Sequence, residues 1–150
     1  MTESTRTIQE RRRDMLARLE RDVDCWVATA SADGVPYLIP LSFLWDGEAL
    51  LISTPASSVT SRNLHATGRA RLGIGPTRDL VLIEATAHPL EPGDLSPEVG
   101  DAFAVKTGFD PRNLKTPYRY FRILPVRIQA WREANELEGR DVMRDGVWLR

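Results

Sequence analysis

The sequence predicts a mainly β fold with flanking helices, in which about six antiparallel strands form a closed or nearly closed barrel. Two Asp-Gly pairs, Asp33-Gly34 and Asp46-Gly47, separate short apolar runs and are the strongest local sign of β-hairpins. No helical crossover lies between these runs, although a parallel sheet would need one. Helical periodicity is confined to stretches before, between and after the hairpins. Together these observations favour an antiparallel meander with helices packed around it.

Composition narrows the class of protein. With 150 residues, 42% hydrophobic and 27% charged, the chain is expected to be one globular domain. It would comprise an N-terminal amphipathic helix (1–21), a barrel with helical insertions (22–132) and a C-terminal hairpin or tail (133–150). A net charge of −1 gives no bulk attraction to nucleic acid or to an anionic membrane. No run is long enough to span a membrane, and no signal-peptide core is found. The single Cys25 suits a cytoplasmic protein.

Residues 5–21 are predicted to form the first helix. Ile8, Met15, Leu16 and Leu19 recur at helical spacing, and charged residues fill the other positions. The run 11–13 consists of three arginines, which we interpret as a solvated face. An anion site for a cofactor with an acidic tail is the alternative.

A dense β region follows, with strands expected over residues 25–31, 35–45 and 48–54. Pro36 and Pro40 interrupt the second of these strands. Because proline cannot donate a hydrogen bond to a sheet ladder, these positions should lie at an edge, a bulge or a gap between strands.

The remaining elements alternate in type. A helix is expected from about Ser58 to Thr67, ended by Gly68 in a left-handed conformation. Strands are expected over residues 69–75 and 80–88, and a short helix from Ser96-Pro97 to Gly108. The last barrel strand is predicted at 126–131, with residues 118–124 leading into Pro125. The tail contains another Asp-Gly turn at 145–146 and should form a small hairpin.

The stretch 50–64 has the chemistry of a phosphate site. An apolar strand ends in Ser53 and Thr54, and the following helix begins with hydroxyl-bearing residues. Exposed N–H groups at a helix start and short hydroxyl donors favour an anion, and Arg62 adds a full charge. Two alternatives remain open. The hydroxyls are also ordinary N-caps, and Arg62 could instead form a structural pair with Glu48 or Glu84.

The side chains offer no self-contained catalytic set, and the catalytic residues are left unassigned. His65 and His88 are the only histidines and lie on different elements, so no metal site is predicted. No Gly-x-Ser-x-Gly motif occurs, and Gly73-Ile74-Gly75 runs into a turn instead of a helix. If the protein is an enzyme, a cofactor must therefore carry the reaction.

Residues 29–36 with Pro40-Leu41-Ser42-Phe43 resemble the first hairpin of the FMN-binding split-barrel family. This family includes the pyridoxamine 5′-phosphate oxidases and the flavin- and deazaflavin-dependent oxidoreductases. Ser53-Thr54, Arg62-Asn63-Leu64 and a strand beginning Arg69-Ala70-Arg71 resemble its next segment. The resemblance covers about residues 22–90 and is weaker through residues 126–131.

The resemblance implies a six-stranded antiparallel split β-barrel and a homodimer with two cofactors at the dimer interface. The cofactor ring would lie on the second strand, closed over by aromatic residues of the partner, and the phosphate would lie at the helix start. The implied cofactor-binding residues are Pro40, Leu41, Ser42, Ser53, Thr54, Ser58, Thr60, Arg62 and Asn63. Thr60 stands where many relatives carry a lysine, which weakens the phosphate site unless an arginine compensates. The C-terminal Arg-Leu-x-Pro ending of true pyridoxamine phosphate oxidases is missing, which argues against that substrate.

The leading interpretation is an FMN- or coenzyme F-420-dependent oxidoreductase that moves a hydride to or from a small organic substrate. The cationic residues are nearly all arginine, since only Lys106 and Lys115 are lysines. This composition is typical of an actinobacterial-type source and leans toward F-420. One alternative is a non-catalytic split-barrel protein that binds or sequesters a flavin, haem or other planar ligand. Another is a structural dimer with an empty site.

Overall fold

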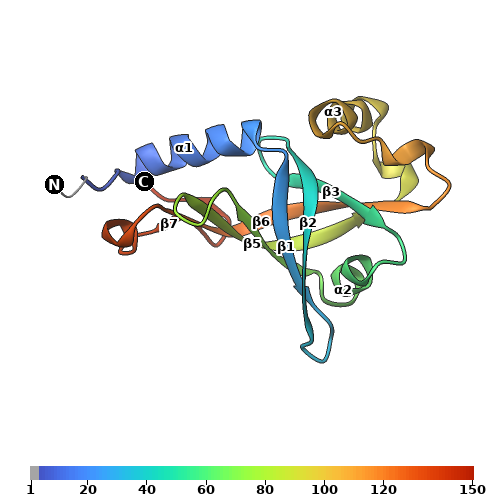
Figure 1. Ribbon diagram of the computed structural model, residues 1–150, viewed down its shortest axis with the longest axis horizontal. Coiled ribbons are helices and arrows are strands. Elements are labelled where there is room, and N and C mark those ends of the chain that lie inside the picture. The colour runs from blue at the N-terminus through green and yellow to red at the C-terminus, as the bar shows by residue number, and fades with distance from the viewer. Residues whose placement is uncertain (1–3) are drawn as a thin grey trace.

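The computed structural model describes residues 4–150 and has a closed barrel of six antiparallel strands at its centre (Figure 1). The barrel strands are β1 (Asp24–Ala30), β2 (Pro36–Trp45), β3 (Leu50–Pro55), β4 (Arg69–Ile74), β5 (Leu80–Leu90) and β6 (Tyr118–Trp131). They lie in the order β3-β2-β1-β4-β5-β6, and pairing of β3 with β6 closes the sheet. The predicted fold class is confirmed. The first three residues of the predicted N-terminal segment lie outside the described residues.

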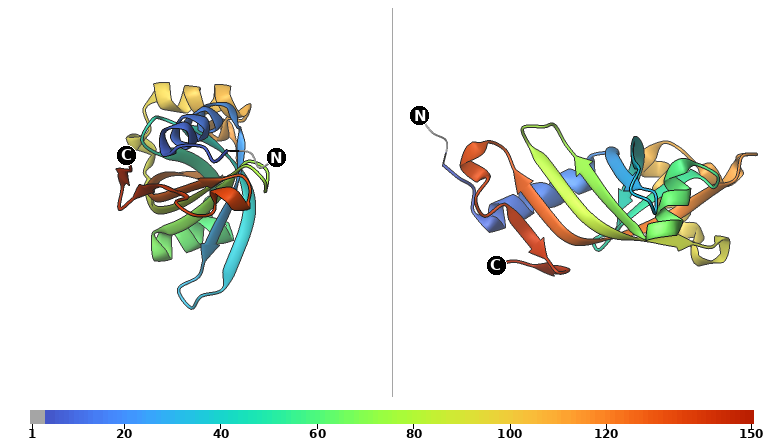
Figure 2. Two further views of the ribbon diagram at one scale, coloured as in Figure 1. Left: turned by 90° about the vertical axis from the view of Figure 1, so that its left-hand side faces the viewer. Right: turned by 90° about the horizontal axis from the view of Figure 1, so that it is seen from below.

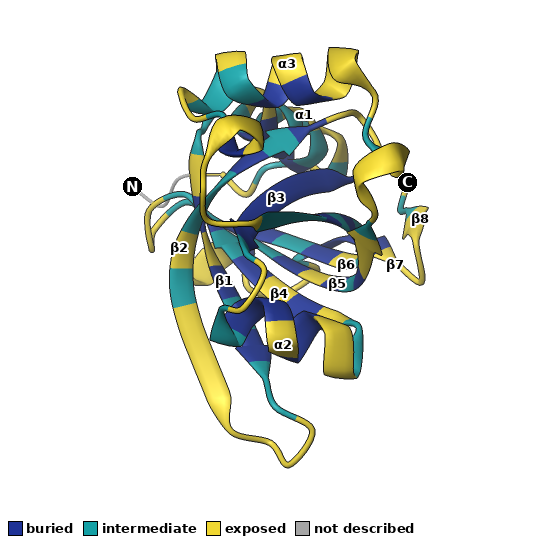
Figure 3. Ribbon diagram, turned by 90° about the vertical axis from the view of Figure 1, so that its right-hand side faces the viewer, coloured by how far each residue is buried: buried dark blue, intermediate teal, exposed yellow. Residues whose placement is uncertain are grey.

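Three α-helices, α1 (Ile8–Arg21), α2 (Val59–Thr67) and α3 (Pro97–Thr107), surround the barrel in the described chain. Helices α2 and α3 lie on opposite sides of it (Figure 3). Their ends follow from the sequence, because Ser58 and Ser96 accept hydrogen bonds from the first turns and Gly68 and Gly108 are left-handed at the C-terminal ends. None of these helices is long and apolar enough to cross a membrane.

The predicted C-terminal hairpin is formed by β7 (Asp141–Arg144) and β8 (Val147–Trp148). Asp145 and Gly146 both have positive φ, 54° and 75°, as a tight Asp-Gly turn requires. Strand β7 pairs with the end of β6, so the hairpin extends the barrel sheet. It lies at the same end of the molecule as α1 (Figure 2).

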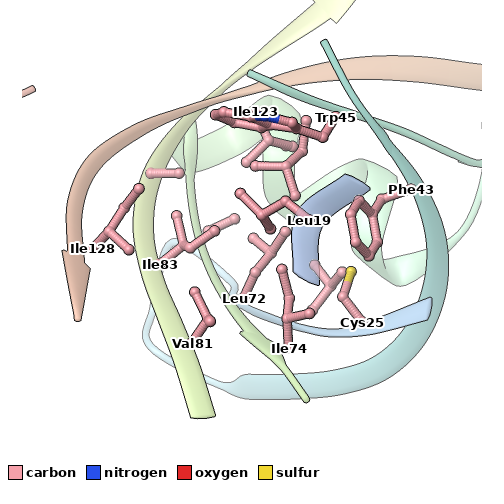
Figure 4. Packing of buried hydrophobic residues seen from close by; sticks show 14 of the residues in the cluster. Leu19, Cys25, Phe43, Trp45, Leu72, Ile74, Val81, Ile83, Ile123 and Ile128 are labelled. Atoms are coloured by element: carbon pink, nitrogen blue, oxygen red, sulfur yellow. The ribbon is translucent and has the colours of Figure 1, made fainter. Parts of the chain in front are cut away.

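The core fills the barrel interior (Figure 4). On β3 and its neighbours, Phe43, Ile52 and Phe121 are paired across the strands and are completely buried. Leu19 of α1 lies among the barrel side chains and is completely buried. The first helix is therefore part of the core, as its apolar spacing predicted.

Strand β6 is longer than expected, because residues 118–131 are one continuous strand that includes Pro125. On one side of β6, β5 pairs along nearly its whole length, and a register shift between Glu84 and Ala85 lies opposite the proline. On the other side, β3 pairs up to Ile123 and β7 begins at Ile128. The missing N–H of Pro125 thus falls between two partner strands, where it costs no ladder bond.

The interpretation of the arginine run 11–13 as a solvated face is wrong for Arg11. Its side chain is buried, and Nη1 donates to the carbonyls of Ala130, Glu136 and Gly139 at 3.3, 3.0 and 3.2 Å. The guanidinium of Arg12 lies 4.3 Å from the ring centroid of Trp148. The first two arginines of the run therefore fasten α1 to the C-terminal segment.

Candidate functional site

Strands β2 and β3 separate at one end of the barrel. Strand β2 pairs with β1 from Pro36 to Ser42, whereas its pairing with β3 covers Phe43–Trp45 in the described chain. Pro36 and Pro40 therefore lie on a free strand edge, where the absence of a backbone donor costs nothing. The sequence prediction of an edge or gap at these prolines is confirmed.

A cavity of about 360 Å³ opens at this gap. It is lined by Asp24, Pro40, Leu41, Ser42, Ser53, Pro55, Phe103, Phe109 and Tyr118. Four of the nine predicted cofactor-binding residues thus line one cavity, on two strands that the fold holds apart. The Ser42 hydroxyl donates to Asp24 Oδ1 at 2.7 Å, which fixes the polar edge of the cavity.

The aromatic side of the cavity comes from the segment after β5. Phe103 is buried on α3, and the rings of Phe109 and Tyr118 meet edge to face with centroids 5.5 Å apart. Lys106 holds α3 in place, since its Nζ lies 4.1 Å from the Phe43 ring centroid and donates to the Leu19 carbonyl at 3.0 Å. Burial lowers the pKa of Lys106. Sequence reasoning missed these three aromatics because only the tertiary fold brings them to β2.

The turn from β3 to α2 is a hydroxyl cluster. Ser53 Oγ donates to the Arg119 carbonyl at 3.3 Å, and Thr54 Oγ1 lies 3.0 Å from Ser58 Oγ. Ser58 Oγ also accepts a hydrogen bond from the Ser61 backbone N–H at 3.0 Å. The capping role that the sequence left open is therefore present, and it engages Ser58 directly.

The other predicted residues of α2 divide into buried and exposed positions. Thr60 and Ser61 are completely buried, and within residues 4–150 their hydroxyls have no hydrogen-bond partner. The Asn63 side-chain amide donates to Thr29 Oγ1 at 3.1 Å in the interior. Arg62 is exposed and has no ion pair in the described part of the chain.

The structural pairs considered for Arg62 are not formed, because other arginines bind the two glutamates. Glu48 lies 3.3 Å from Arg122, and Glu84 lies 3.7 Å from Arg71. This leaves the Arg62 guanidinium available to an anion at the β3–α2 turn.

The remaining chemistry-bearing side chains lie elsewhere. His65 Nε2 lies 3.0 Å from Arg119 Nη1, and His88 Nε2 lies 3.0 Å from the Thr86 hydroxyl. Burial raises the pKa of the Cys25 thiol to about 12, so the thiolate is not populated near neutral pH. Residues 4–150 contain no cluster of histidine, cysteine or carboxylate side chains arranged to hold a metal ion.

Comparison with known proteins agrees with the split-barrel fold. The sequence model of a family described as pyridoxamine 5′-phosphate oxidase matches residues 12–133, which include every barrel strand. Comparison with curated proteins gave no match.

Several solved structures share the fold. An FAD-binding protein from Mesorhizobium loti is 18% identical, with a TM-score of 0.64 over 78% of this chain and 89% of its own. An F420 reductase is 18% identical, with a TM-score of 0.59 over 75% of this chain and 93% of its own. The haem storage protein HutZ from Vibrio cholerae is 16% identical, with a TM-score of 0.61 over 77% and 89%. At sequence identities of 16–18%, the similarity to these proteins shows a shared fold and no more.

Proposed function

The chain belongs to the pyridoxamine 5′-phosphate oxidase family, and from this we propose that it binds FMN or coenzyme F-420 as a redox cofactor. The protein would use it to move a hydride to or from a small organic substrate. When bound, either cofactor supplies the hydride donor or acceptor, which the side chains themselves do not provide. A composition rich in arginine and poor in lysine favours F-420 slightly. The folds of an F420 reductase and of an FAD-binding protein are both similar to this one, which supports a redox cofactor of the flavin or deazaflavin type without separating the two.

The observation that carries the proposal is the cavity at the gap between β2 and β3. Its volume of about 360 Å³ lies within the usual range for ligand pockets. Pro40, Leu41 and Ser42 present a free strand edge, so their backbone and small side chains can contact a flat ring. Phe103, Phe109 and Tyr118 form an apolar wall that keeps water from the ring.

The hydroxyl cluster fits the phosphate end of such a cofactor. Thr54 and Ser58 lie next to this cavity in the chain, since Ser53 and Pro55 line it. The Thr60 hydroxyl is buried without a partner among the described residues, and such a group calls for an explanation. We assign the exposed Arg62 to the phosphate, and a contact of the completely buried Thr60 hydroxyl with it stays an expectation from the family resemblance. In many relatives a lysine at the position of Thr60 supplies the positive charge, and here Arg62 would supply it.

We also propose that the functional unit is a cytoplasmic homodimer. The β1–β2 hairpin projects beyond the barrel (Figure 3). On it, Trp26, Val35 and Leu38 are 54%, 60% and 59% exposed. Large exposed apolar side chains on a projecting hairpin are typical of an interface. The free, buried Cys25 is compatible with a reducing compartment.

A second candidate function is binding of haem or another planar ligand without catalysis. Two observations favour it. The haem storage protein HutZ shares the fold, and the cavity wall offers few side chains for acid–base catalysis. Among the described lining residues, Asp24 and Tyr118 are the titratable side chains, and the Asp24 carboxylate accepts the Ser42 hydroxyl.

Titration of the purified protein with FMN, F-420 and haem, followed by visible absorbance, tests these alternatives. Saturable binding of FMN or F-420, with reduction of the bound cofactor by a reductant and reoxidation by an acceptor, supports the oxidoreductase. Tight binding of haem with no binding of either flavin-type cofactor supports the second candidate. Binding of none of the three contradicts both and leaves a structural dimer.

A further inference from the structure

A cross-strand pair, Asp24 on β1 and Ser42 on β2, forms the polar edge of the candidate cofactor cavity. The two residues lie opposite each other in the sheet, and the Ser42 hydroxyl donates to Asp24 Oδ1 at 2.7 Å. Both side chains line the cavity. The sequence does not single out Asp24, and the oxidoreductase proposed above assigns it no role.

The hydrogen bond between these two residues fixes the direction of the Ser42 hydroxyl. An ionised carboxylate has no proton and can only accept, whereas a serine hydroxyl has one proton and two lone pairs. Because that proton is directed at Asp24, the Ser42 oxygen offers lone pairs to a ligand and no donor. A ligand with an N–H group can therefore bind to Ser42, and a ligand with a bare acceptor cannot.

The negative charge of Asp24 acts in the same direction. Across residues 4–150, no cationic side chain forms an ion pair with Asp24. Arg18 lines a neighbouring cavity of about 420 Å³ together with Asp24, but it binds Asp22 and Asp79 at 2.9 and 2.8 Å. The unpaired carboxylate makes the potential at this edge of the cavity negative, which favours a donor group over an acceptor.

The backbone of β2 adds few donors at the gap. The Phe43 N–H donates to the Val23 carbonyl at 2.9 Å, and successive residues of an antiparallel strand direct their backbone groups to opposite sides. Pro40 and Ser42 therefore direct their backbone groups away from β1, to the free strand edge. Since proline has no N–H, the only backbone donor of these two residues is that of Ser42.

The facing edge of β3 has the same character. The Ala56 N–H donates to the Pro117 carbonyl on the β6 side at 2.9 Å, so the alternation directs Ser53 and Pro55 to the gap. Pro55 again brings no N–H. The Ser53 hydroxyl donates to the Arg119 carbonyl at 3.3 Å, so its oxygen also offers lone pairs to a ligand.

We propose that Asp24 sets the hydrogen-bond specificity of this cavity. By holding the Ser42 proton, it makes the cavity select a flat ligand that presents an N–H group to β1 and β2. Asp24 acts through Ser42 and is therefore a positioning residue. The identity of the ligand as a cofactor ring or a heterocyclic substrate rests on the proposed function, whereas the selection for a donor does not.

Three bicyclic probes of similar shape test the proposal. Indole has an N–H donor, indene has neither donor nor acceptor, and benzoxazole has a ring-nitrogen acceptor. Dissociation constants are measured by equilibrium dialysis on the protein without added cofactor. We expect indole to bind about fivefold more tightly than indene, as one neutral hydrogen bond allows. Benzoxazole should bind more weakly than indene.

Asp24→Ala releases the Ser42 proton, which can then be donated to a ligand. Relative to indene, benzoxazole should therefore gain about fivefold in affinity, and indole should gain nothing. A purely structural role of Asp24 would give no such gain for one probe. In the double variant Asp24→Ala/Ser42→Ala no hydroxyl remains to donate, so the benzoxazole gain should vanish.

Asp33→Ala is the matched control. Asp33 accepts a hydrogen bond from the Ser31 hydroxyl at 2.6 Å, so the variant removes a pair of the same kind at the turn between β1 and β2. Neither residue lines the cavity. The affinities of all three probes should stay unchanged in this variant, and circular dichroism checks the fold of each protein.

The inference is overturned if benzoxazole binds the unchanged protein as tightly as indole, or if no probe binds. It is also overturned if Asp24→Ala gives benzoxazole no gain over indene, or if that gain persists in the double variant. Cofactor titration is scored separately. If FMN or F-420 binds but the probes are not selected, the proposed function stands and this inference fails. If the probes are selected and neither cofactor binds, the selection stands and the proposed function fails.

Discussion

The side-chain amide of Asn63 and the hydroxyl of Thr29 meet in a buried hydrogen bond of 3.1 Å. The two residues belong to α2 and β1, which pack against each other. The bond therefore fixes α2, and with it the hydroxyl cluster at the helix start, against the barrel wall. This hydrogen bond occupies the Asn63 amide. The contact of Asn63 with a cofactor, which the family resemblance implies, therefore stays a prediction.

Asn63→Ala should lower the free energy of unfolding by about 1–3 kcal/mol, because it leaves the buried Thr29 hydroxyl without its donor. Urea denaturation measures the change. Arg62→Ala, one residue away on the exposed side of the same helix, is the matched control and should change stability by less than about 0.5 kcal/mol. Equal stability of the two variants would show that the Asn63 bond contributes nothing.

Acid sensitivity should come in large part from Glu136. Hydrogen bonds from the Arg6 side chain at 2.8 and 2.9 Å lower the pKa of Glu136 from 4.5 to about 2, against the effect of burial. The folded-state pKa is depressed, so the unfolded chain binds the proton first as pH falls. The stabilisation is complete above about pH 4.5 and is lost between there and pH 2, with a total of roughly 3 kcal/mol.

The measurement is the free energy of unfolding from pH 7 to pH 2 for the unchanged protein and for Glu136→Gln. Other carboxylates with lowered pKa values, such as Asp46 and Asp141, contribute equally in both. The difference between the two curves should therefore shrink as pH falls below 4.5. A constant difference would exclude Glu136 as the titrating group.

The fold followed from local signals because each turn carries its own chemistry. The Asp-Gly pairs at 33–34 and 46–47 set the hairpins, and the left-handed Gly68 ended α2 where expected. The sequence predicts only residues 126–131 of β6 as a barrel strand, because a proline such as Pro125 usually interrupts a sheet ladder. Its missing N–H is harmless only through the positions of β3 and β7, which are tertiary facts.

The site could be predicted in part for the same reason. Pro40 marks a free strand edge locally, and so the sequence identifies one wall of the cavity between β2 and β3, whereas a cofactor ring bound there stays a prediction. Phe103 on α3 and Tyr118 at the start of β6 reach the cavity through tertiary packing, and no periodicity carries that information. The buried position of Arg11 was likewise invisible, because the carbonyls that hold it belong to the C-terminal segment.

Leu38→Asp should convert the proposed homodimer into a monomer. An obligate dimer buries more than about 2,000 Å², and a carboxylate on the exposed β1–β2 hairpin would have to be desolvated at that surface. Sedimentation velocity at micromolar concentration measures the change. Val105→Asp, at an 85% exposed position on α3, is the matched control and should stay dimeric. An unchanged protein that sediments as a monomer would remove the dimer from the proposal.

Ser42→Trp should abolish cofactor binding and leave the fold intact. Ser42 lines the cavity at the free edge of β2, so an indole there fills the space assigned to the ring. Titration with FMN and F-420 measures affinity, and circular dichroism checks the fold. Val105→Trp adds the same bulk to an exposed site outside the cavity and should bind normally. Normal affinity in Ser42→Trp would place the ring elsewhere.

Arg62→Ala tests whether Arg62 binds the phosphate of the cofactor. A charge-assisted hydrogen bond contributes roughly 1.5–3 kcal/mol, which corresponds to about 10- to 150-fold in affinity. We expect FMN or F-420 to bind more weakly by that factor, with an unchanged melting temperature, because Arg62 is exposed and the candidate glutamates pair with Arg71 and Arg122. Arg78→Ala, at the exposed β4–β5 turn, controls for loss of one positive charge and should bind either cofactor as the unchanged protein does. If affinity falls equally in both variants, the effect is long-range electrostatics. If affinity is unchanged in Arg62→Ala, the hydroxyls and the helix start alone hold the phosphate.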